Sequence, residues 1–595
     1  MMNIHTQLQN ALADALKVIF GIENQTIVLE KTREEFEGDF TFVVFPIVKL
    51  AKKSPEQTAQ LLGDYLEKNT TLIAKFNVIK GFLNLKIADK VWIETLNSIQ
   101  QTPNFGQFEP KNQRIMVEFA SPNTNKPLHL GHLRNIFLGD AISRILQMYG
   151  YQVIKANLIN DRGIHICKSM LAYQKMGEGQ TPQTTGIKGD KLVGKFYVAF
   201  EQIYKREIQQ LIEQGLTQEQ AERQAPALLE AQELLRKWEE NHPETIQLWK
   251  TMNQWVYDGF EATFREINVS FDKIYYESDT YLLGKDIVEE GLQKGIFYKK
   301  PDGSVWIDLT EEKLDHKLVL RADGTSVYIT QDLGTADLKY NDFQIDKSIY
   351  VVGNEQDYHF KVLFAILQKL GRNYAQGLYH LSYGMVDLPS GKMKSREGTV
   401  VDADDLIAEM KQTAKKRTQE LGKVSELSEI EKEKLYQILG VGALKYFLLK
   451  VEPKKRMLFN PEESIDFQGN TASFIQYTFA RVHSLKRKAE ELGINFTTLP
   501  ATTDLPLHPT EQKVIFMLYQ FPAVIQKAAE GYSPAEIANY AYDLTRAFNQ
   551  FYSECSIFKA ETEAQIQFRL SLANQVGHVI QQALALLGIE VPERM

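Results

Sequence analysis

The strongest constraint on the fold is an alternation of strand-like and helix-like segments that begins near residue 114. The run RIMVEFA (114–120) is short and apolar, as is typical of a buried strand. The run GHLRNIFLGDAISRILQMYG (131–150) has helical spacing, and QVIKANLI (152–159) is strand-like again. A strand, a helix and a second strand in this order predict a βαβ unit and a parallel sheet. Further short strands are predicted at SVWIDL (304–309), SVYITQDL (326–333) and SIYVVG (348–353).

The regions on either side of this alternation have different patterns, so we expect a multidomain protein, α/β plus all-α. Residues 1–108 predict a small α+β unit that ends in a polar linker. Residues 112–400 predict the parallel-sheet domain, with a polar, Glu- and Gln-rich helical insertion at about 178–270. Residues 401–595 predict a helical bundle, because amphipathic stripes follow capping boxes such as that of SEIEKEKLYQILGVGALKYF (428–447).

Length, net charge and cysteine content limit which classes of protein this chain can belong to. A chain of 595 residues is too long for one hydrophobic core, and its net charge of −8 argues against a surface coated in positive charge. The two cysteines, Cys167 and Cys555, make neither a zinc site nor a disulfide framework, which fits a reducing compartment. No signal peptide or membrane-spanning run is recognisable. We expect a soluble cytoplasmic protein without a metal site of its own.

The stretch SPNTNKPLHLGHLRN (121–135) lies where the first predicted strand gives way to a helix. In parallel sheets ligands bind at the carboxyl ends of strands, and a helix N-terminus there suits phosphate. His129 and His132 are three residues apart and share a face of the first helical turn. Both could donate hydrogen bonds to phosphate, and Gly131 would let a flat ring approach the backbone. A pair of histidines that only caps a turn is the alternative.

A second candidate element is LPSGKMKSREGTVV (388–401), which places Lys392, Lys394 and Arg396 among Gly and Ser. Alone, such a segment is more often an exposed basic turn than a site. Together with the histidine turn it favours phosphoryl or nucleotidyl transfer, where catalysis is mostly positioning and stabilisation of developing charge. No Walker A motif and no dinucleotide-binding glycine motif follows a predicted strand.

These two elements resemble the HIGH and KMSKS motifs of class I aminoacyl-tRNA synthetases. The longer string EFASPNTNKPLHLGHLRN (118–135) is similar to the arginyl version, as are NLINDRGIHI (157–166), DGTSVYITQDLGTA (323–336), YVVGNEQDYHF (350–360) and LLGIEVPERM (586–595). The resemblance covers essentially the whole chain. It implies a Rossmann-type catalytic domain between an N-terminal added domain and a C-terminal helical anticodon-binding domain. The implied activity is that of an arginine–tRNA ligase using L-arginine, ATP with Mg²⁺, and tRNA(Arg).

An arginine site requires groups that accept from a planar guanidinium, such as carboxylates. On charge grounds Glu118 and Asp332 are the candidates; the alternative for Glu118 is a buried ion pair. The resemblance implies that Tyr328 and Asp332 line the side-chain pocket, and that Asn123 and Gln356 hold the α-amino and carboxylate ends. The set predicted to bind arginine is Glu118, Asn123, His129, Tyr328, Asp332 and Gln356.

The basic segment departs from KMSKS, because Lys394 and Ser395 stand where that motif has a serine and then a lysine. Arginyl-tRNA synthetases with this departure resemble one another in having a compensating lysine just upstream of the two histidines. The residue at that position in this chain is Lys126. The predicted catalytic residues are Lys126, His129, His132, Lys392 and Lys394. The predicted ATP-binding residues are His129, Gly131, His132, Met393 and Ser395.

Contact with tRNA follows from the resemblance more than from the charge. The cluster ARVHSLKRKAEEL (480–492) is basic beside aromatic residues, yet a solvated helix face explains it equally well. By resemblance, Phe82 and Asn84 are predicted to contact the tRNA elbow and Met595 to lie at the anticodon pocket. A monomer is expected. The competing hypotheses are another HIGH-bearing transferase, a synthetase for another amino acid, and a non-catalytic tRNA-binding paralogue.

Overall fold

The computed structural model describes residues 4–33, 35–387, 401–420, 427–464, 466, 468–500 and 505–595. Its centre is a five-stranded sheet in the order β12-β11-β5-β6-β7, in which every neighbouring pair is parallel. The strands are β5 (Arg114–Glu118), β6 (Gln152–Ile159), β7 (Lys273–Tyr276), β11 (Lys347–Gly353) and β12 (Leu378–Tyr383). Helix α5 (Leu130–Met148) joins β5 to β6. The predicted parallel-sheet domain is therefore confirmed, and the strand order reverses at β5, where ligands bind in sheets of this type.

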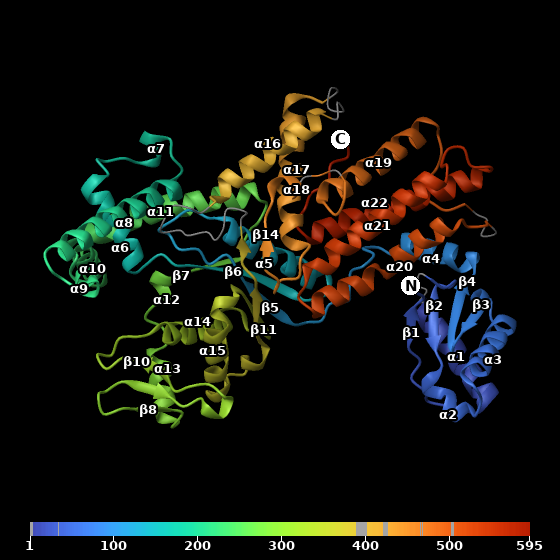
Figure 1. Ribbon diagram of the computed structural model, residues 1–595, viewed down its shortest axis with the longest axis horizontal. Coiled ribbons are helices and arrows are strands. Elements are labelled where there is room, and N and C mark those ends of the chain that lie inside the picture. The colour runs from blue at the N-terminus through green and yellow to red at the C-terminus, as the bar shows by residue number, and fades with distance from the viewer. Residues whose placement is uncertain are drawn as a thin grey trace.

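An inserted layer of helices follows β6 and lies at one end of the molecule (Figure 1). It consists of α6 (Ile164–Met176), α7 (Pro182–Thr185), α8 (Gly189–Glu213), α9 (Gln218–Gln224), α10 (Pro226–Glu239) and α11 (Pro243–Glu266). Trp238 of α10 and Trp249 of α11 meet edge to face with their ring centroids 5.5 Å apart, a contact that joins these two helices.

A second lobe lies between β7 and the end of the sheet. Its elements are α12 (Glu277–Thr280), α13 (Lys285–Gln293), β8 (Phe297–Lys299), β9 (Val305–Ile307), η2 (Thr310–Glu312), β10 (Lys317–Leu320), α14 (Tyr328–Phe343), η3 (Asn354–Gln356), α15 (Asp357–Lys369) and η4 (Ala375–Gly377). The short strand β13 (Val386–Asp387) follows β12, and its Val386 belongs to the main core. Strands β8, β9 and β10 form a small antiparallel sheet. The lobe has its own core, separate from the main one.

The strand predicted at 326–333 is wrong, because α14 begins at Tyr328. Its β-branched and aromatic residues look strand-like in a short window. Thr330, however, is fully buried beside β10, where its hydroxyl donates to the carbonyl of Val319, and the helix continues beyond that window to Phe343. The correction matters for the site, because residues 328 and 332 then lie one helical turn apart on the same face.

The N-terminal unit is an antiparallel sheet in the order β1-β2-β4-β3 with helices packed on it. Its elements are α1 (Ile4–Phe20), β1 (Leu29–Lys31), β2 (Phe40–Val43), η1 (Phe45–Ile47), α2 (Val48–Ala51), α3 (Pro55–Asn69), β3 (Ile73–Ile79), β4 (Phe82–Ile87) and α4 (Asp89–Gln101). Ser54 accepts a hydrogen bond from the Gln57 amide at 3.2 Å and so caps the N-terminus of α3.

The C-terminal region is helical. It contains α16 (Ala403–Glu420), α17 (Glu429–Leu449), the two-residue strand β14 (Met457–Leu458), α18 (Pro461–Ser464), α19 (Ala472–Glu491), α20 (Pro509–Glu530), α21 (Pro534–Glu554) and α22 (Glu563–Leu586). The long helices run side by side at the end opposite the inserted layer (Figure 1). The N-terminal unit docks on this bundle: Trp92 of α4 meets Phe516 of α20 with ring centroids 5.9 Å apart.

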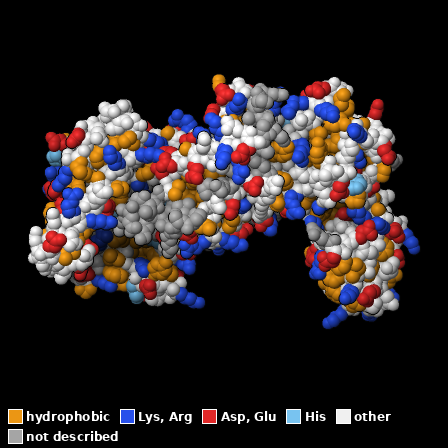
Figure 2. Space-filling view, turned by 45° about the horizontal axis from the view of Figure 1, so that its top comes forward, with side chains coloured by type: hydrophobic (Ala, Val, Ile, Leu, Met, Phe, Trp, Pro, Cys, Tyr) orange, Lys and Arg blue, Asp and Glu red, His pale blue; other side chains and the backbone are white. Residues whose placement is uncertain are grey.

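The visible surface carries basic and acidic side chains intermixed (Figure 2), in keeping with the small negative net charge. Within the described part of the chain, no helix is both long and apolar enough to cross a membrane.

Candidate active site

The chain leaves β5 through two left-handed residues that are not glycine. Ala120 has φ 73° and Ser121 has φ 42°, a conformation that costs free energy and that persists where surrounding contacts enforce it. The Ala120 amide donates to the side-chain oxygen of Asn135 at 2.6 Å, and the Ser121 amide donates to that of Asn157 at 3.1 Å. Both asparagines are buried. They hold the turn that carries residues 121–129 across the carboxyl end of the sheet.

The histidine turn is the N-terminus of α5. His129 is the N-cap, and its Nδ1 accepts from the Gly131 amide at 3.1 Å. The Nδ1 of His132 accepts from the amide of His129 at 3.2 Å, and the two rings lie 3.9 Å apart. Because both Nδ1 atoms are acceptors, the proton of each neutral ring is on Nε2. Each ring therefore keeps one N–H donor at the positive end of the helix dipole, where an anion is favoured.

Both histidines are neutral at physiological pH. Desolvation, and then the positive charge of Lys126, lower the pKa of His129 to about 3. Desolvation, His129 and Lys126 together lower the pKa of His132 well below its usual value. The rings therefore act as hydrogen-bond donors rather than as cations. The positive charge beside them belongs to Lys126, which would neutralise an anion at this turn.

A cavity of about 280 Å³ adjoins the histidine turn. Its lining includes Lys126, Leu128 and His129 on one side and Lys191, Gly194 and Tyr197 of α8 on the other. The wall is completed by the start of α16, which is tied to the turn: the Leu130 amide donates to Val401 at 3.2 Å and the Ala403 amide donates to Leu128 at 2.9 Å.

Ion pairs connect the inserted helix α8 to the start of α16, which forms part of the cavity wall. Lys188 lies 2.7 Å from Asp404, and Lys191 lies 3.1 Å from Asp402 and 2.7 Å from Asp405. Lys188 also contacts the fully buried Asp190 at 3.3 Å. Helix α8 is thus held against the start of α16, which begins just after the basic segment in sequence.

Gly194 lets α8 approach the segment that carries Lys126. A Cβ at Gly194 would lie 2.7 Å from Cδ of Pro127 and 3.6 Å from Cα of Lys126, so Gly194→Ala must displace that segment. If this turn binds ATP, as the resemblance implies, we expect the KM for ATP to rise by about ten- to a hundredfold, since catalysis by positioning is sensitive to small shifts. Steady-state kinetics with varied ATP and varied arginine would show this. A parallel rise in the arginine KM would instead indicate general disruption of the site.

The predicted arginine residues Tyr328 and Asp332 lie one turn apart at the start of α14. Tyr328 is 76% exposed, so it is not part of the hydrophobic core. Asp332 accepts from Nε2 of His359 at 2.6 Å, which orients its carboxylate. Gln356 is exposed at the end of η3, just before α15, and Asn123 is exposed in the loop before the histidines. These side chains are therefore accessible to a ligand.

Glu118 is in a different environment. It is buried at the end of β5 and pairs through Oε2 with the buried ammonium of Lys339 on α14. That attraction raises the pKa of Lys339 against the cost of its burial. The ion-pair alternative for Glu118 is therefore what the structure shows. That Glu118 binds the guanidinium of the substrate stays a prediction. In that case the substrate and Lys339 would share the carboxylate of Glu118.

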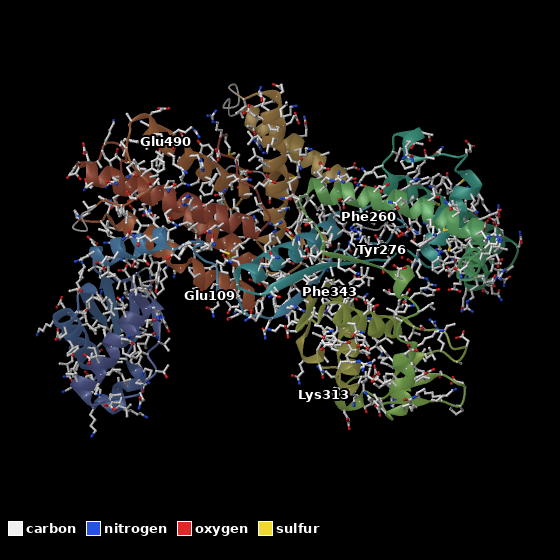
Figure 3. All side chains as sticks on the ribbon, turned by 180° about the vertical axis from the view of Figure 1, so that it is seen from behind. Glu109, Phe260, Tyr276, Lys313, Phe343 and Glu490 are labelled. Carbon is white, nitrogen blue, oxygen red and sulfur yellow. The ribbon has the colours of Figure 1, made fainter. Side chains whose placement is uncertain are left out.

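Two acidic residues of the site were missed by sequence reasoning. Asp161 is buried and accepts from Ser278 and from the hydroxyl of Tyr257 at 2.8 Å, which joins the end of β6 to α12 and α11. Figure 3 labels Phe260, which follows Tyr257 on α11, and Tyr276, the residue before α12. Burial, then Asp161 and Asp332, raise the pKa of Glu277 to about 7 against the opposing effect of Arg162. Asp161 lies within the family-like string NLINDRGIHI, which could have identified it as a site residue. Glu277 lies in none of the motifs recognised in the sequence.

The remaining predicted residues divide into three groups. Lys392, Met393, Lys394 and Ser395 lie outside the described residues. Phe82 is half-buried, with its ring 5.8 Å from that of Phe45 and Arg33 above it, and the terminal Met595 is also half-buried. Asn84 has no exposed surface, and its amide is bonded to Thr41 and Asn77, so a direct contact of Asn84 with RNA does not fit this structure.

Comparison with known proteins agrees with this geometry. Three family models match: "tRNA synthetases class I (R), catalytic domain" over 95–460, "DALR anticodon binding domain" over 475–595 and "Arginyl tRNA synthetase N terminal domain" over 3–87. Arginine–tRNA ligases of Amoebophilus asiaticus and Bacteroides thetaiotaomicron are each 55% identical, with 100% of both chains covered. The Thermus thermophilus arginyl-tRNA synthetase has the same fold, with a TM-score of 0.76 at 24% identity over 100% of both chains. The chain therefore belongs to the class I arginyl-tRNA synthetase family.

Proposed function

We propose that the chain activates L-arginine with ATP and transfers the arginyl group to tRNA(Arg). In the first step an oxygen of the arginine carboxylate attacks the α-phosphorus of ATP, the bond to the β-phosphate breaks, and arginyl-adenylate and pyrophosphate form. In the second step a hydroxyl of the terminal ribose attacks the arginyl carbonyl and AMP leaves. Neither step needs a covalent enzyme intermediate, so the protein acts by positioning and by stabilising charge.

One observation carries the assignment of the phosphate site: two neutral imidazoles with their Nε2–H groups available, at a helix N-terminus beside Lys126. In the proposal His129 and His132 donate to phosphate oxygens, Gly131 admits the nucleotide, and Lys126 neutralises charge. Among the residues that the structure describes, no group of three or more His, Cys, Asp or Glu could hold a metal ion. In the proposal Mg²⁺ accompanies ATP and is held by its phosphates.

The arginine would lie between the histidine turn and α14. Asp332 and Tyr328 take the guanidinium, because a carboxylate fixed by His359 and an adjacent phenol offer oppositely charged and polar partners. Asn123, His129 and Gln356 hold the α-amino and carboxylate ends. Glu118 contributes to the guanidinium site together with Lys339.

The chain is proposed to act in the cytoplasm as a monomer, with residues 1–108 at the tRNA elbow, 112–400 in catalysis and 401–595 at the anticodon. The exposed face of Phe45, Phe82 and Arg33 supports an RNA contact by the first region, since aromatic rings and a guanidinium stack on unpaired bases. Met595 is placed at the anticodon pocket.

Aminoacylation of total tRNA with each amino acid in turn tests the proposal. Arginine alone should be attached, and ATP–pyrophosphate exchange, measured with and without tRNA, should also require arginine. Attachment of another amino acid would support the hypothesis of a different synthetase. Binding of tRNA without any attachment would support the non-catalytic paralogue.

A further inference from the structure

Lys445 is a fully buried lysine that no step of the proposed reaction uses. It lies on α17, and its ammonium donates to the main-chain carbonyl of Gly588 at 2.6 Å. Desolvation lowers the pKa of Lys445 to about 8, against the opposing attraction of Asp140 on α5. A buried cation costs free energy that an apolar side chain of similar size would avoid. Packing alone therefore does not explain a lysine here, whereas its directed bond to the chain at Gly588 does.

Gly588 lies just after α22 and begins the segment 588–595, which we call the C-terminal segment. Its amide and that of Ile589 donate back to carbonyls in the last turns of α22, at 2.9 Å each, and Gly588 has φ 68°. A Cβ at Gly588 would lie 3.0 Å from both the Asp140 carboxylate and the Lys445 ammonium. The point at which the C-terminal segment leaves α22 is therefore fixed against α5 and α17.

Two more side-chain donors hold the C-terminal segment along α19. The buried Gln476 donates to the main-chain carbonyl of Glu590 at 2.8 Å, and Arg487 donates to that of Glu593 at 3.3 Å. The segment itself belongs to no helix or strand. Donors from α17 and α19 therefore do for this segment what a backbone ladder does for a strand, and they set its path across the bundle.

That path runs beside basic residues of α19. Desolvation and Lys486 lower the pKa of His483, while Glu593 of the C-terminal segment acts in the opposite direction, so these three side chains lie near one another. Met595 packs at the edge of the main core. Basic side chains beside exposed main chain suit the phosphates and bases of an RNA loop.

We propose that Lys445 is a positioning residue for tRNA: through the Gly588 carbonyl it sets where the C-terminal segment leaves α22, and so how that segment lies beside the basic residues of α19. Gln476 fixes the next part of the segment in the same way. Lys445 is buried, touches no RNA and acts through the main chain. This inference rests on the proposed function, because it assigns this part of the helical bundle to the anticodon.

The first test compares Lys445→Met with the wild-type enzyme in aminoacylation, with tRNA(Arg), ATP and arginine varied separately and thermal unfolding measured in parallel. Methionine is also unbranched and fills the same space, but it cannot donate to Gly588. We expect the KM for tRNA to rise by about tenfold and the KM values for ATP and arginine to be unchanged. Loss of activity that only follows the unfolded fraction, with a normal KM for tRNA, would overturn the inference.

A second test uses two glycines, because a variant of the buried Lys445 could fail to fold. Gly588 and Gly493 follow α22 and α19 in the same way, with φ of 68° and 67°, but nothing lies within 4 Å of a Cβ at Gly493. Alanine brings the same backbone strain at both positions, and only at Gly588 does it also press on Asp140 and Lys445.

Gly588→Ala should therefore raise the KM for tRNA, and Gly493→Ala should leave it near the wild-type value. Equal KM values for tRNA in the two variants would refute the inference. A wild-type enzyme that attaches no arginine to tRNA would refute the proposed function instead, so the two failures are distinguishable.

Discussion

Lys126→Ala is expected to lower kcat/KM for ATP by about 10²- to 10³-fold, the range for removing one preorganised group that stabilises transition-state charge. His129 and His132 are neutral, so they donate hydrogen bonds but bring no charge to the phosphates. The charge must come from a cation at the turn, and Lys126 is close enough to depress the pKa of both rings. ATP–pyrophosphate exchange with arginine, measured in the presence of tRNA, gives the size of the effect, and the KM for arginine should change little.

The matched control is Lys195→Ala, which removes an exposed lysine of α8 from the rim of the same cavity. Its ATP kinetics should stay near wild type if the effect of Lys126 is local. Normal kinetics in Lys126→Ala would indicate that Lys392 and Lys394, rather than Lys126, neutralise the phosphates. The departure from KMSKS leaves open which of these lysines does so. A loss in both variants would indicate a general electrostatic effect of the cavity.

The architecture was predictable because its signals are local. The βαβ order around β5 and β6, the capping boxes at Ser54 and Ser428 and the helical stripes of the C-terminal region all depend on neighbours within a few turns. The error at 326–333 has the same origin. Eight residues with alternating branched side chains cannot show that Thr330 will be buried at the start of a helix by its contact with Val319.

Only those parts of the site that lie within one short sequence motif were predictable. The histidine turn satisfies its own hydrogen bonds within four residues, so its sequence is enough to recognise it. Partners distant in sequence were not foreseen: Lys339 for Glu118, and the interior of the N-terminal sheet for Asn84. In each case the tertiary fold decides whether a polar side chain faces a ligand or a buried neighbour.

Asp332→Asn should raise the KM for arginine by about 10²-fold or more, because truncating one member of a hydrogen-bonded charge pair costs about 2–5 kcal/mol. The variant keeps the size of the side chain and can still bond to His359, so α14 should fold normally. It loses the negative charge that compensates the guanidinium. Aminoacylation at saturating ATP and tRNA, with arginine varied, measures the effect, and the KM for ATP should be unchanged.

Asp337→Asn on the same helix is the matched control. Asp337 accepts from Nε of Arg372 at 3.0 Å and from the hydroxyl of Tyr374, contacts that stabilise the lobe without reaching the substrate groups. This variant should lower the melting temperature and leave the KM for arginine unchanged. Glu118→Gln decides the remaining question. If it raises the arginine KM while Asp332→Asn does not, the guanidinium binds at the Glu118–Lys339 pair, and Asp332 serves to orient His359.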